Sequence, residues 1–259
     1  MSDLETVRHD TKGAVAIVTI ARPDAMNSFN TALRRDLLTA FERAAGDEAI
    51  RAVVLTGEGR SFSAGADLKD MENKRPIDEM LQHEYRPVFE CIATMRQPVI
   101  AAVGGSAAGI GMSYALACDL LIMAEDAFLL SPFTTISLVP DGGLNWLLVQ
   151  QLGYRRAFQL SIESERISAH RSVELGLANR AVPADKLTDE AVAWAERIAE
   201  RAPLSVAATK KAMRHAVAHD WGSTFDVEAP LQRELRASAD CAEGVTAFFE
   251  KRKPEFTGR

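Results

Sequence analysis

Short apolar runs alternate with amphipathic segments over the first two-thirds of the chain. Ala14–Ile20 and Arg51–Gly57 are rich in β-branched residues and are followed by Gly, Pro and Ser, a pattern that predicts strands. Between them, Thr31–Ala45 carries apolar residues at the three- and four-residue spacing of one helix face. This order favours an α/β fold with largely parallel strands. Further elements of the same kinds follow: a helix over 76–95, despite Pro87, and strands at 98–103, 119–124 and 127–130.

The pattern changes from Ser168 onward, where helix-like segments dominate and only Asn179–Pro183 resembles a strand. Amphipathic segments with no sheet left to cover can pack on their own core or dock on a partner subunit. The helix-like segments lie at 168–178, 184–202, 203–220 and 242–256.

Composition narrows the classes of protein. A chain of 259 residues with 47% hydrophobic content supports one substantial core. The net charge of −6, without a basic stripe interleaved with aromatics, argues against a nucleic-acid partner. Cys91, Cys118 and Cys241 are odd in number and widely spaced, which predicts no disulfide framework or metal site and favours a reducing compartment. The polar N-terminus and the lack of a long apolar run lead us to expect a cytoplasmic protein without a membrane partner.

A glycine-rich stretch, Val103–Leu120, admits two interpretations. Gly105, Gly109 and Gly111 approximate a dinucleotide fingerprint, and Glu125 follows at the distance of a ribose-binding acid. The same glycines can instead hold backbone N–H groups open to a negative charge that develops during a reaction.

Three features count against the dinucleotide interpretation. At least two strand–helix units precede the stretch, whereas the fingerprint usually follows the first strand. None of Tyr85, Tyr114 and Tyr154 has a lysine four residues later, the pair used by common enzymes with this spacing. The helix after Gly111 has room for only about two turns before the strand-like residues at 120.

Four motifs in order carry a resemblance to a known family. They are "RPDAMNS" (22–28), "SFSAGADLKDM" (61–71), the glycine-rich stretch and "AFFEKRKPEF" (247–256). Together they resemble the crotonase superfamily, also called enoyl-CoA hydratase/isomerase, over nearly the whole chain. The resemblance implies a spiral of ββα units over 1–197 with an acyl-CoA site, and a C-terminal helical trimerisation region over 198–259. It also implies acyl-CoA thioester substrates and a homotrimer or a dimer of trimers.

By the same resemblance, the N–H groups of Ala66 and Ile110 bind the thioester oxygen. The family usually has glycine at the second position, but a backbone donor tolerates a side chain. Removal of a proton beside a thioester places negative charge on that oxygen, and donors fixed in advance stabilise the enolate. Gly109 then allows close approach of backbone and ligand.

The acid/base residues decide the reaction. Family hydratases add water with two glutamates, and their positions here are occupied by Ser113 and Phe133. Asp141, in "LVPDGGLNWLL", matches the position of the acid/base in the Δ3,Δ2-enoyl-CoA isomerase and ring-oxepin/epoxyphenylacetyl-CoA isomerase branches. It is also placed to cap the helix that follows, and both roles can coexist. Burial would raise its pKa and make it a better base. We expect an apolar wall around it from Phe133, Val139, Leu144 and Trp146.

The remaining site residues are assigned to binding by resemblance. Ala25 and Met26 offer backbone to the CoA chain, and the C-terminal pair Phe248 and Lys251 closes the CoA pocket. Asp24 replaces a lysine that the family often has there. The other expected binding residues are Ala64, Ala66, Asp67, Leu68, Gly109, Ile110 and Phe133.

The sequence therefore predicts an acyl-CoA isomerase that moves a proton through a thioester enolate. One carboxylate suffices for a 1,3-proton shift, whereas hydration needs a second group to activate water. Coenzyme A enters as part of the substrate, and no metal or redox cofactor is implied. A hydratase-like enzyme of weak or different activity and a non-catalytic acyl-CoA-binding protein remain the alternatives.

Overall fold

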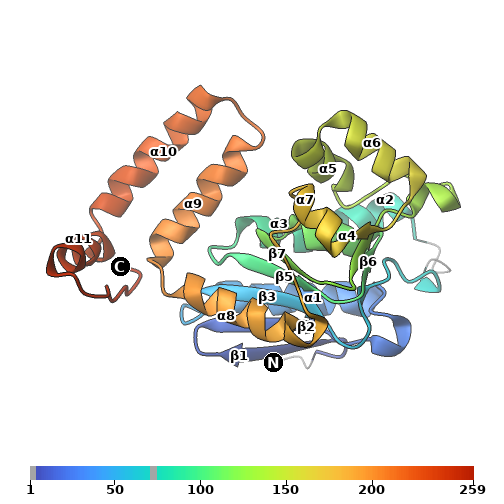
Figure 1. The fold of residues 1–259 in the computed structure, drawn as a ribbon, viewed down its shortest axis with the longest axis horizontal. Coiled ribbons are helices and arrows are strands. Elements are labelled where there is room, and N and C mark those ends of the chain that lie inside the picture. The colour runs from blue at the N-terminus through green and yellow to red at the C-terminus, as the bar shows by residue number, and fades with distance from the viewer. Residues whose placement is uncertain (1–3, 71–74) are drawn as a thin grey trace.

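Six strands form the larger of two sheets. The computed structural model, which describes residues 4–70 and 75–259, orders them β1-β2-β3-β5-β7-β10 (Figure 1). β1 is antiparallel to β2, and each other neighbouring pair is parallel. The apolar runs seen in the sequence form the buried centre of this sheet, as predicted. The bounds are β1 Val7–Lys12, β2 Val15–Ile20, β3 Ala52–Gly57, β5 Val99–Val103, β7 Leu120–Ala124 and β10 Arg180–Val182.

A second, four-stranded sheet has the order β4-β6-β8-β9. Each turn of the chain supplies one strand to each sheet, since β4 follows β3, β6 follows β5 and β8 follows β7. This repeat of two strands before the chain returns through a helical segment is a ββα spiral, which confirms the predicted fold class. The bounds are β4 Ser61–Ser63, β6 Ser106–Ala108, β8 Phe128–Leu130 and β9 Ile167–Ser168.

Helices cover the larger sheet. α1 (Thr31–Gly46) packs against β1 and β2, and α8 (Leu187–Ala199) packs across β2, β3 and β5. α1 begins where the Asn30 side chain accepts a hydrogen bond from the Leu33 N–H at 2.9 Å. The helix predicted over 76–95 is real but interrupted, because α2 (Ile77–Met80) and α3 (Arg86–Thr94) are joined by a π-helical turn, Leu81–Tyr85.

Shorter helices connect the strands. The helix after the glycine-rich stretch, α4, has two turns, as expected. None of the helices in the described residues has both the length and the hydropathy needed to cross a membrane. The bounds are α4 Ile110–Ala117, α5 Leu144–Leu152, α6 Tyr154–Glu163 and α7 Ala169–Glu174.

The last three helices form an arm that projects from the sheets (Figure 1). α9 (Pro203–Ala216) and α10 (Trp221–Arg236) pack against each other, and α11 (Ala239–Glu250) packs at the far end of α10. The sequence pattern predicted α9 and α11 but gave no indication of α10. That helix contains Pro230, a residue that usually interrupts a helix, and none of its residues is buried against the core.

Asp119 fastens the arm to the core. Its carboxylate accepts from Lys210 Nζ at 2.8 Å and from Arg214 Nη2 at 2.7 Å, both on α9. Arg214 also donates to the main-chain oxygen of Ala117, the last residue of α4. Lys210 is buried, and burial lowers the pKa of its ammonium although Asp119 opposes the shift. The arm is therefore bonded directly to the end of α4.

Candidate active site

Two glycines bring the loops after β4 and β6 into backbone contact. Gly65 has φ +101°, and a Cβ added there would lie 3.0 Å from the Ala108 oxygen and 3.7 Å from Gly109 Cα. A side chain at Gly65 would force the two loops apart. The residues that directly follow these glycines, Ala66 and Ile110, therefore flank one position.

The N–H groups of Ala66 and Ile110 are both left out of the regular hydrogen-bond ladders. Ala66 forms a parallel bridge with Phe29, in which the Phe29 N–H donates to Gly65 O at 2.8 Å and the Asp67 N–H donates to Phe29 O at 3.0 Å. In such a bridge, the bonded groups belong to the residues on either side of Ala66, so its own N–H points away from Phe29. Ile110 is the first residue of α4, where the N–H has no acceptor within the helix and the helix dipole favours negative charge.

The dinucleotide interpretation of the glycine-rich stretch is wrong. Gly105 and Gly109 lie at opposite ends of β6, because Ser106–Ala108 forms a strand of the smaller sheet. A pyrophosphate fingerprint needs its glycines in a single turn between a strand and a helix. Here only Gly109 is next to the helix.

Asp141 lies just before α5, but it does not cap that helix. The N-cap residue is Gly143, and no side chain bonds to the first turn. The cap interpretation is therefore wrong, because two glycines with positive φ turn the chain between Asp141 and Leu144. Asp141 Oδ1 is buried and has no hydrogen-bond partner among the described residues. Burial raises the pKa of Asp141 to about 6, only partly opposed by its own N–H.

The backbone around Asp141 packs tightly against α4. Ser113 Oγ donates to the Asp141 main-chain oxygen at 2.9 Å. Gly142 leaves no room for a side chain, since an added Cβ would lie 2.4 Å from Ile110 Cδ1 and 2.9 Å from Phe89 Cζ. The residue beside Asp141 thus touches Ile110, whose N–H is one of the two predicted donors. A half-buried carboxyl group with a raised pKa therefore lies next to the residue that carries one of the two predicted backbone donors.

The apolar wall expected around Asp141 forms only in part. Phe133 and Leu144 are buried, and the Phe133 ring lies within 3.8 Å of a Cβ added at Gly109. Val139 and Trp146 do not contribute as expected, because they are 71% and 45% exposed. The stretch 134–139 runs along the surface, which turns Val139 outward. Phe89 occupies the position next to Gly142 instead.

The residues predicted to bind the CoA chain lie together beside these loops. The Ala64 N–H donates to Met26 O at 2.9 Å, which joins the Ala25–Met26 turn to the loop after β4. Asp67 forms an ion pair with Arg22 at 3.0 Å. Burial works to raise the pKa of Asp67, but the hydrogen bonds from the Arg22 side chain and the Lys69 N–H outweigh burial, so the pKa is lowered. Ala64 and Leu68 are exposed, as ligand-contacting positions need to be.

Phe248 and Lys251 are not near the other site residues in a single chain. Both are exposed at the end of α11, which packs on α10. Figure 1 shows α11 at the opposite end of the molecule from α4 and β6.

Two residues at the site escaped prediction from sequence. The sequence shows Ser113 only as the replacement of a glutamate, because its bond to Asp141 depends on how the chain folds back. Arg34, near the Ala66 loop, donates hydrogen bonds to five acceptors. A signal for it exists, because Arg34 adjoins the apolar stripe Leu33, Leu37 and Phe41 on the buried face of α1.

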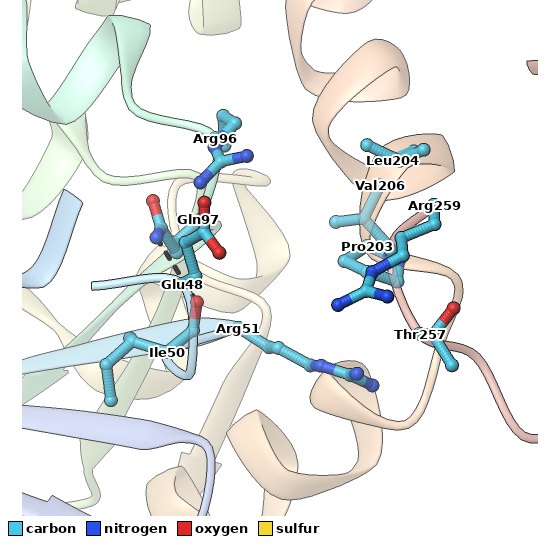
Figure 2. Close-up of a pocket in the computed structure, with 11 residues that line it drawn as sticks. Glu48, Ile50, Arg51, Arg96, Gln97, Pro203, Leu204, Val206, Thr257 and Arg259 are labelled. Atoms are coloured by element: carbon cyan, nitrogen blue, oxygen red, sulfur yellow. Dashed lines mark hydrogen bonds between the residues drawn. The ribbon is translucent and has the colours of Figure 1, made fainter. Parts of the chain in front are cut away.

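A separate cavity of about 270 Å³ lies between the core and the arm. Figure 2 shows Arg51, Arg96 and Arg259 around it, together with Glu48. Arg51 and Arg96 precede β3 and β5, so this cavity lies at the amino ends of the strands. The candidate site lies past their carboxyl ends, and the cavity contributes nothing to it.

Comparisons with known proteins agree with this geometry. The enoyl-CoA hydratase/isomerase family matches residues 10–259. A probable enoyl-CoA hydratase of Rhodobacter capsulatus is 40% identical over 255 residues, covering 98% of both chains. The 1,2-epoxyphenylacetyl-CoA isomerase of Escherichia coli is 34% identical over 256 residues, covering 97% of both. A crystal structure of an enoyl-CoA hydratase subunit from Geobacillus kaustophilus superposes with a TM-score of 0.94 at 33% identity, covering 100% of both chains.

The chain therefore belongs to the enoyl-CoA hydratase/isomerase family and has the crotonase fold. It is an enzyme of a family that acts on acyl-CoA thioesters.

Proposed function

We propose that this enzyme is an acyl-CoA isomerase that shifts a double bond by moving one proton through a thioester enolate. The observation that carries the proposal is the half-buried carboxyl group of Asp141, which lies beside the Ala66 and Ile110 loops and has a pKa of about 6. Its Oδ1 atom is buried and has no hydrogen-bond partner among the described residues. Ser113 and Phe133 stand where the resemblance places the two glutamates of hydratases.

The proposed reaction begins with the thioester oxygen between the N–H groups of Ala66 and Ile110. Ionised Asp141 takes a proton from the α or γ carbon, and the electrons move onto the thioester oxygen as an enolate. The two donors stabilise this charge, an effect worth about 10²–10³ in rate for each donor. Protonated Asp141 then returns the proton at the other end of the three-carbon unit. The apolar contacts from Phe133 and Phe89 keep water from competing for the enolate.

Ser113 does not replace a second carboxylate in this scheme. Its hydroxyl donates to Asp141 O, a main-chain atom that cannot accept a proton for catalysis. No general base is thereby offered to activate water at this position. This favours isomerisation over hydration, although the Rhodobacter capsulatus relative is named a probable hydratase.

A turnover panel of CoA thioesters tests the proposal. The purified enzyme is offered 3-enoyl-CoA, 2-enoyl-CoA and 1,2-epoxyphenylacetyl-CoA, and isomerised and hydrated products are separated. We expect isomerisation by the parent enzyme and a loss of about 10²–10⁴ in rate for Asp141→Asn, with acyl-CoA affinity nearly unchanged. Hydration of 2-enoyl-CoA at a higher rate than any isomerisation would make the enzyme a hydratase. Binding without turnover of any thioester would make it an acyl-CoA-binding protein.

We further propose that the chain assembles as a trimer or a dimer of trimers, works in the cytoplasm and needs no cofactor. The arm exposes large apolar side chains, including Trp221 at 80% and Phe248 at 78%. Exposed apolar patches often mark protein–protein contact sites. A neighbouring copy would cover this surface and could bring Phe248 and Lys251 to the CoA pocket.

A further inference from the structure

Arg34 is a fully buried cation whose donors all have partners. Its side chain is 1% exposed and lies on the inner face of α1. Nη1 donates to Phe29 O and to the Tyr85 hydroxyl, both at 3.2 Å. Nη2 donates to Asp70 at 2.8 Å and to Thr31 Oγ1 at 3.0 Å, and Nε donates to Glu84 at 2.8 Å. Removing an arginine from water is costly, so such a group persists only where its partners are held in place.

One of these partners is the carbonyl that fixes Ala66. Phe29 O accepts from the Arg34 guanidinium and from the Asp67 N–H, while the Phe29 N–H donates to Gly65 O. The two backbone bonds lie on either side of Ala66 and determine the direction of its N–H. Arg34 therefore holds the strand-like segment against which the Ala66 loop is aligned.

Arg34 also holds the same loop further along. Asp70 lies four residues after Ala66, and its carboxylate forms an ion pair with Arg34. Glu84 and Tyr85, in the π-helical turn, close the other side of the cluster. The loop is thus fixed by one buried cation both through Phe29 and through Asp70. The planar guanidinium group of Arg34 donates to five acceptors, and this fixes the loop more rigidly than a single hydrogen bond would.

We propose that Arg34 is a positioning residue for the Ala66 donor: by fixing Phe29 O and Asp70, it aims the Ala66 N–H at the thioester oxygen. This inference rests on the oxyanion site of the proposed function. A donor that is displaced by a fraction of an ångström stabilises the enolate less, although the substrate still binds. Arg34 touches neither the substrate nor Asp141 in this role.

The test measures the thioester carbonyl of a bound acyl-CoA by infrared spectroscopy. A ¹³C-labelled hexanoyl-CoA, which has no double bond to move, is bound to the parent, Arg34→Lys, Arg34→Gln and Arg35→Gln proteins. Arg35 is the control, because it lies on the same helix but pairs with Asp36 instead. We expect a shift of the carbonyl band to lower frequency in the parent and in Arg35→Gln, and a smaller shift in both Arg34 variants.

Turnover of the substrate preferred by the parent provides the second measurement. We expect kcat to fall about 10- to 100-fold in Arg34→Gln with KM within a few-fold, and Arg34→Lys to lie between Gln and the parent. If Arg34→Gln does not fold, as circular dichroism would reveal, Arg34→Lys alone decides. An unchanged band shift in the folded Arg34→Lys protein overturns the inference, even if its activity falls. The absence of any band shift in the parent protein would instead contradict both the oxyanion site and the proposed function.

Discussion

The Ser113 hydroxyl donates a hydrogen bond to the Asp141 main-chain oxygen across 28 positions of sequence, at 2.9 Å. Ser113 lies on α4, the helix that begins with Ile110, whereas Asp141 precedes α5. One hydroxyl thus joins the helix that carries a predicted donor to the residue that carries the predicted base. The position at which family hydratases are expected to hold an acid is used here to support a different acid.

Ser113→Ala should weaken this support without removing any reacting group. Loss of one buried hydrogen bond is expected to lower the free energy of unfolding by about 1 kcal/mol. We expect kcat to fall several-fold and KM to change little, because the Asp141 carboxyl group would be positioned less precisely in the variant. Urea denaturation and steady-state kinetics measure the two effects. Full activity in a destabilised variant would show that the bond serves folding alone.

The pH dependence of activity should report the pKa of Asp141. Because the base must be ionised and its pKa is raised to about 6, kcat/KM should rise with pH up to about 6 and then level off. An aspartate at its ordinary value would already be fully active at pH 5. A profile that is flat between pH 5 and 7 would contradict the assignment of Asp141 as the base.

The same pKa shift predicts how stability depends on pH. The folded chain binds the Asp141 proton more tightly than the unfolded chain does, so this contribution is present at low pH and is lost as the pH rises from about 4 to about 6. A shift from 3.8 to about 6 corresponds to about 3 kcal/mol. Asp141→Asn should therefore be more stable than the parent near pH 7, and the difference should shrink toward pH 4. Denaturant midpoints of both proteins at several pH values measure it.

Gly142 and Gly143 are a matched pair of positions at which alanine substitutions separate backbone strain from side-chain packing. Both have positive φ, at +62° and +79°, so alanine strains the backbone by about 1 kcal/mol at either position. Only at Gly142 does the added methyl group collide with Ile110, Phe89 and Ser113, and overpacking of this kind costs about 1–3 kcal/mol more. We expect Gly142→Ala to lose stability and most activity, and Gly143→Ala to lose little activity. Equal losses in the two variants would show that backbone strain, not packing, is the cause.

Assembly should depend on the apolar surface of the arm. Sedimentation velocity at micromolar concentration should show a trimer or a larger multiple of three. Phe225→Asp, which places a charge on exposed α10, is expected to shift the protein toward monomer. Asp226→Asn, the neighbouring exposed position, is the control and should leave assembly unchanged. A parent protein that sediments as a monomer would contradict the proposal.

Lys251 should contribute to CoA affinity only in the assembled protein. Lys251→Gln is expected to raise KM several-fold for a CoA thioester and to leave kcat unchanged, because a lost charge weakens attraction to the phosphates. Lys253→Gln, which removes only an exposed pair with Glu200, serves as the control. The same rise in KM for a thioester without phosphates would mean that Lys251 does not act on the CoA part.

The parts of the fold that were predicted are those with strong periodicity or long apolar runs, such as α1 and the strands β3, β5 and β7. The smaller sheet was not predicted as a sheet, because β4 and β6 are three residues long and consist of Ser, Phe and Ala. The polar edge strand β1 gave no apolar run, since five of its six positions are not fully buried. Pairing with other strands, rather than local preference, makes these segments extended.

The candidate site was likewise predicted only in part. Motifs placed Ala66, Ile110 and Asp141, and the structure brings their surroundings together. The role of Asp141 as a cap was wrong because capping depends on the backbone turn at Gly142 and Gly143, which a favourable residue type cannot reveal. Contacts between distant segments, such as Ser113 with Asp141 and Arg34 with Phe29, have no periodic signal in a single sequence. Phe248 and Lys251, which were assigned to the site by resemblance, lie apart from the other site residues within one chain.

The ion pairs of Asp119 with Lys210 and Arg214 determine what a shortened form of the protein would lose. Cutting the chain before α9 would remove Lys210 and Arg214 together, and Asp119 would lose both of its cations while keeping its bond from the Val99 N–H. Ala117 O, at the end of α4, would lose its donor in the same step. A truncated protein would therefore differ from the parent inside the core as well as in assembly. Loss of activity on deleting the arm would not by itself show that neighbouring copies take part in the reaction, and substitutions on the outer surface of the arm are the sounder experiment.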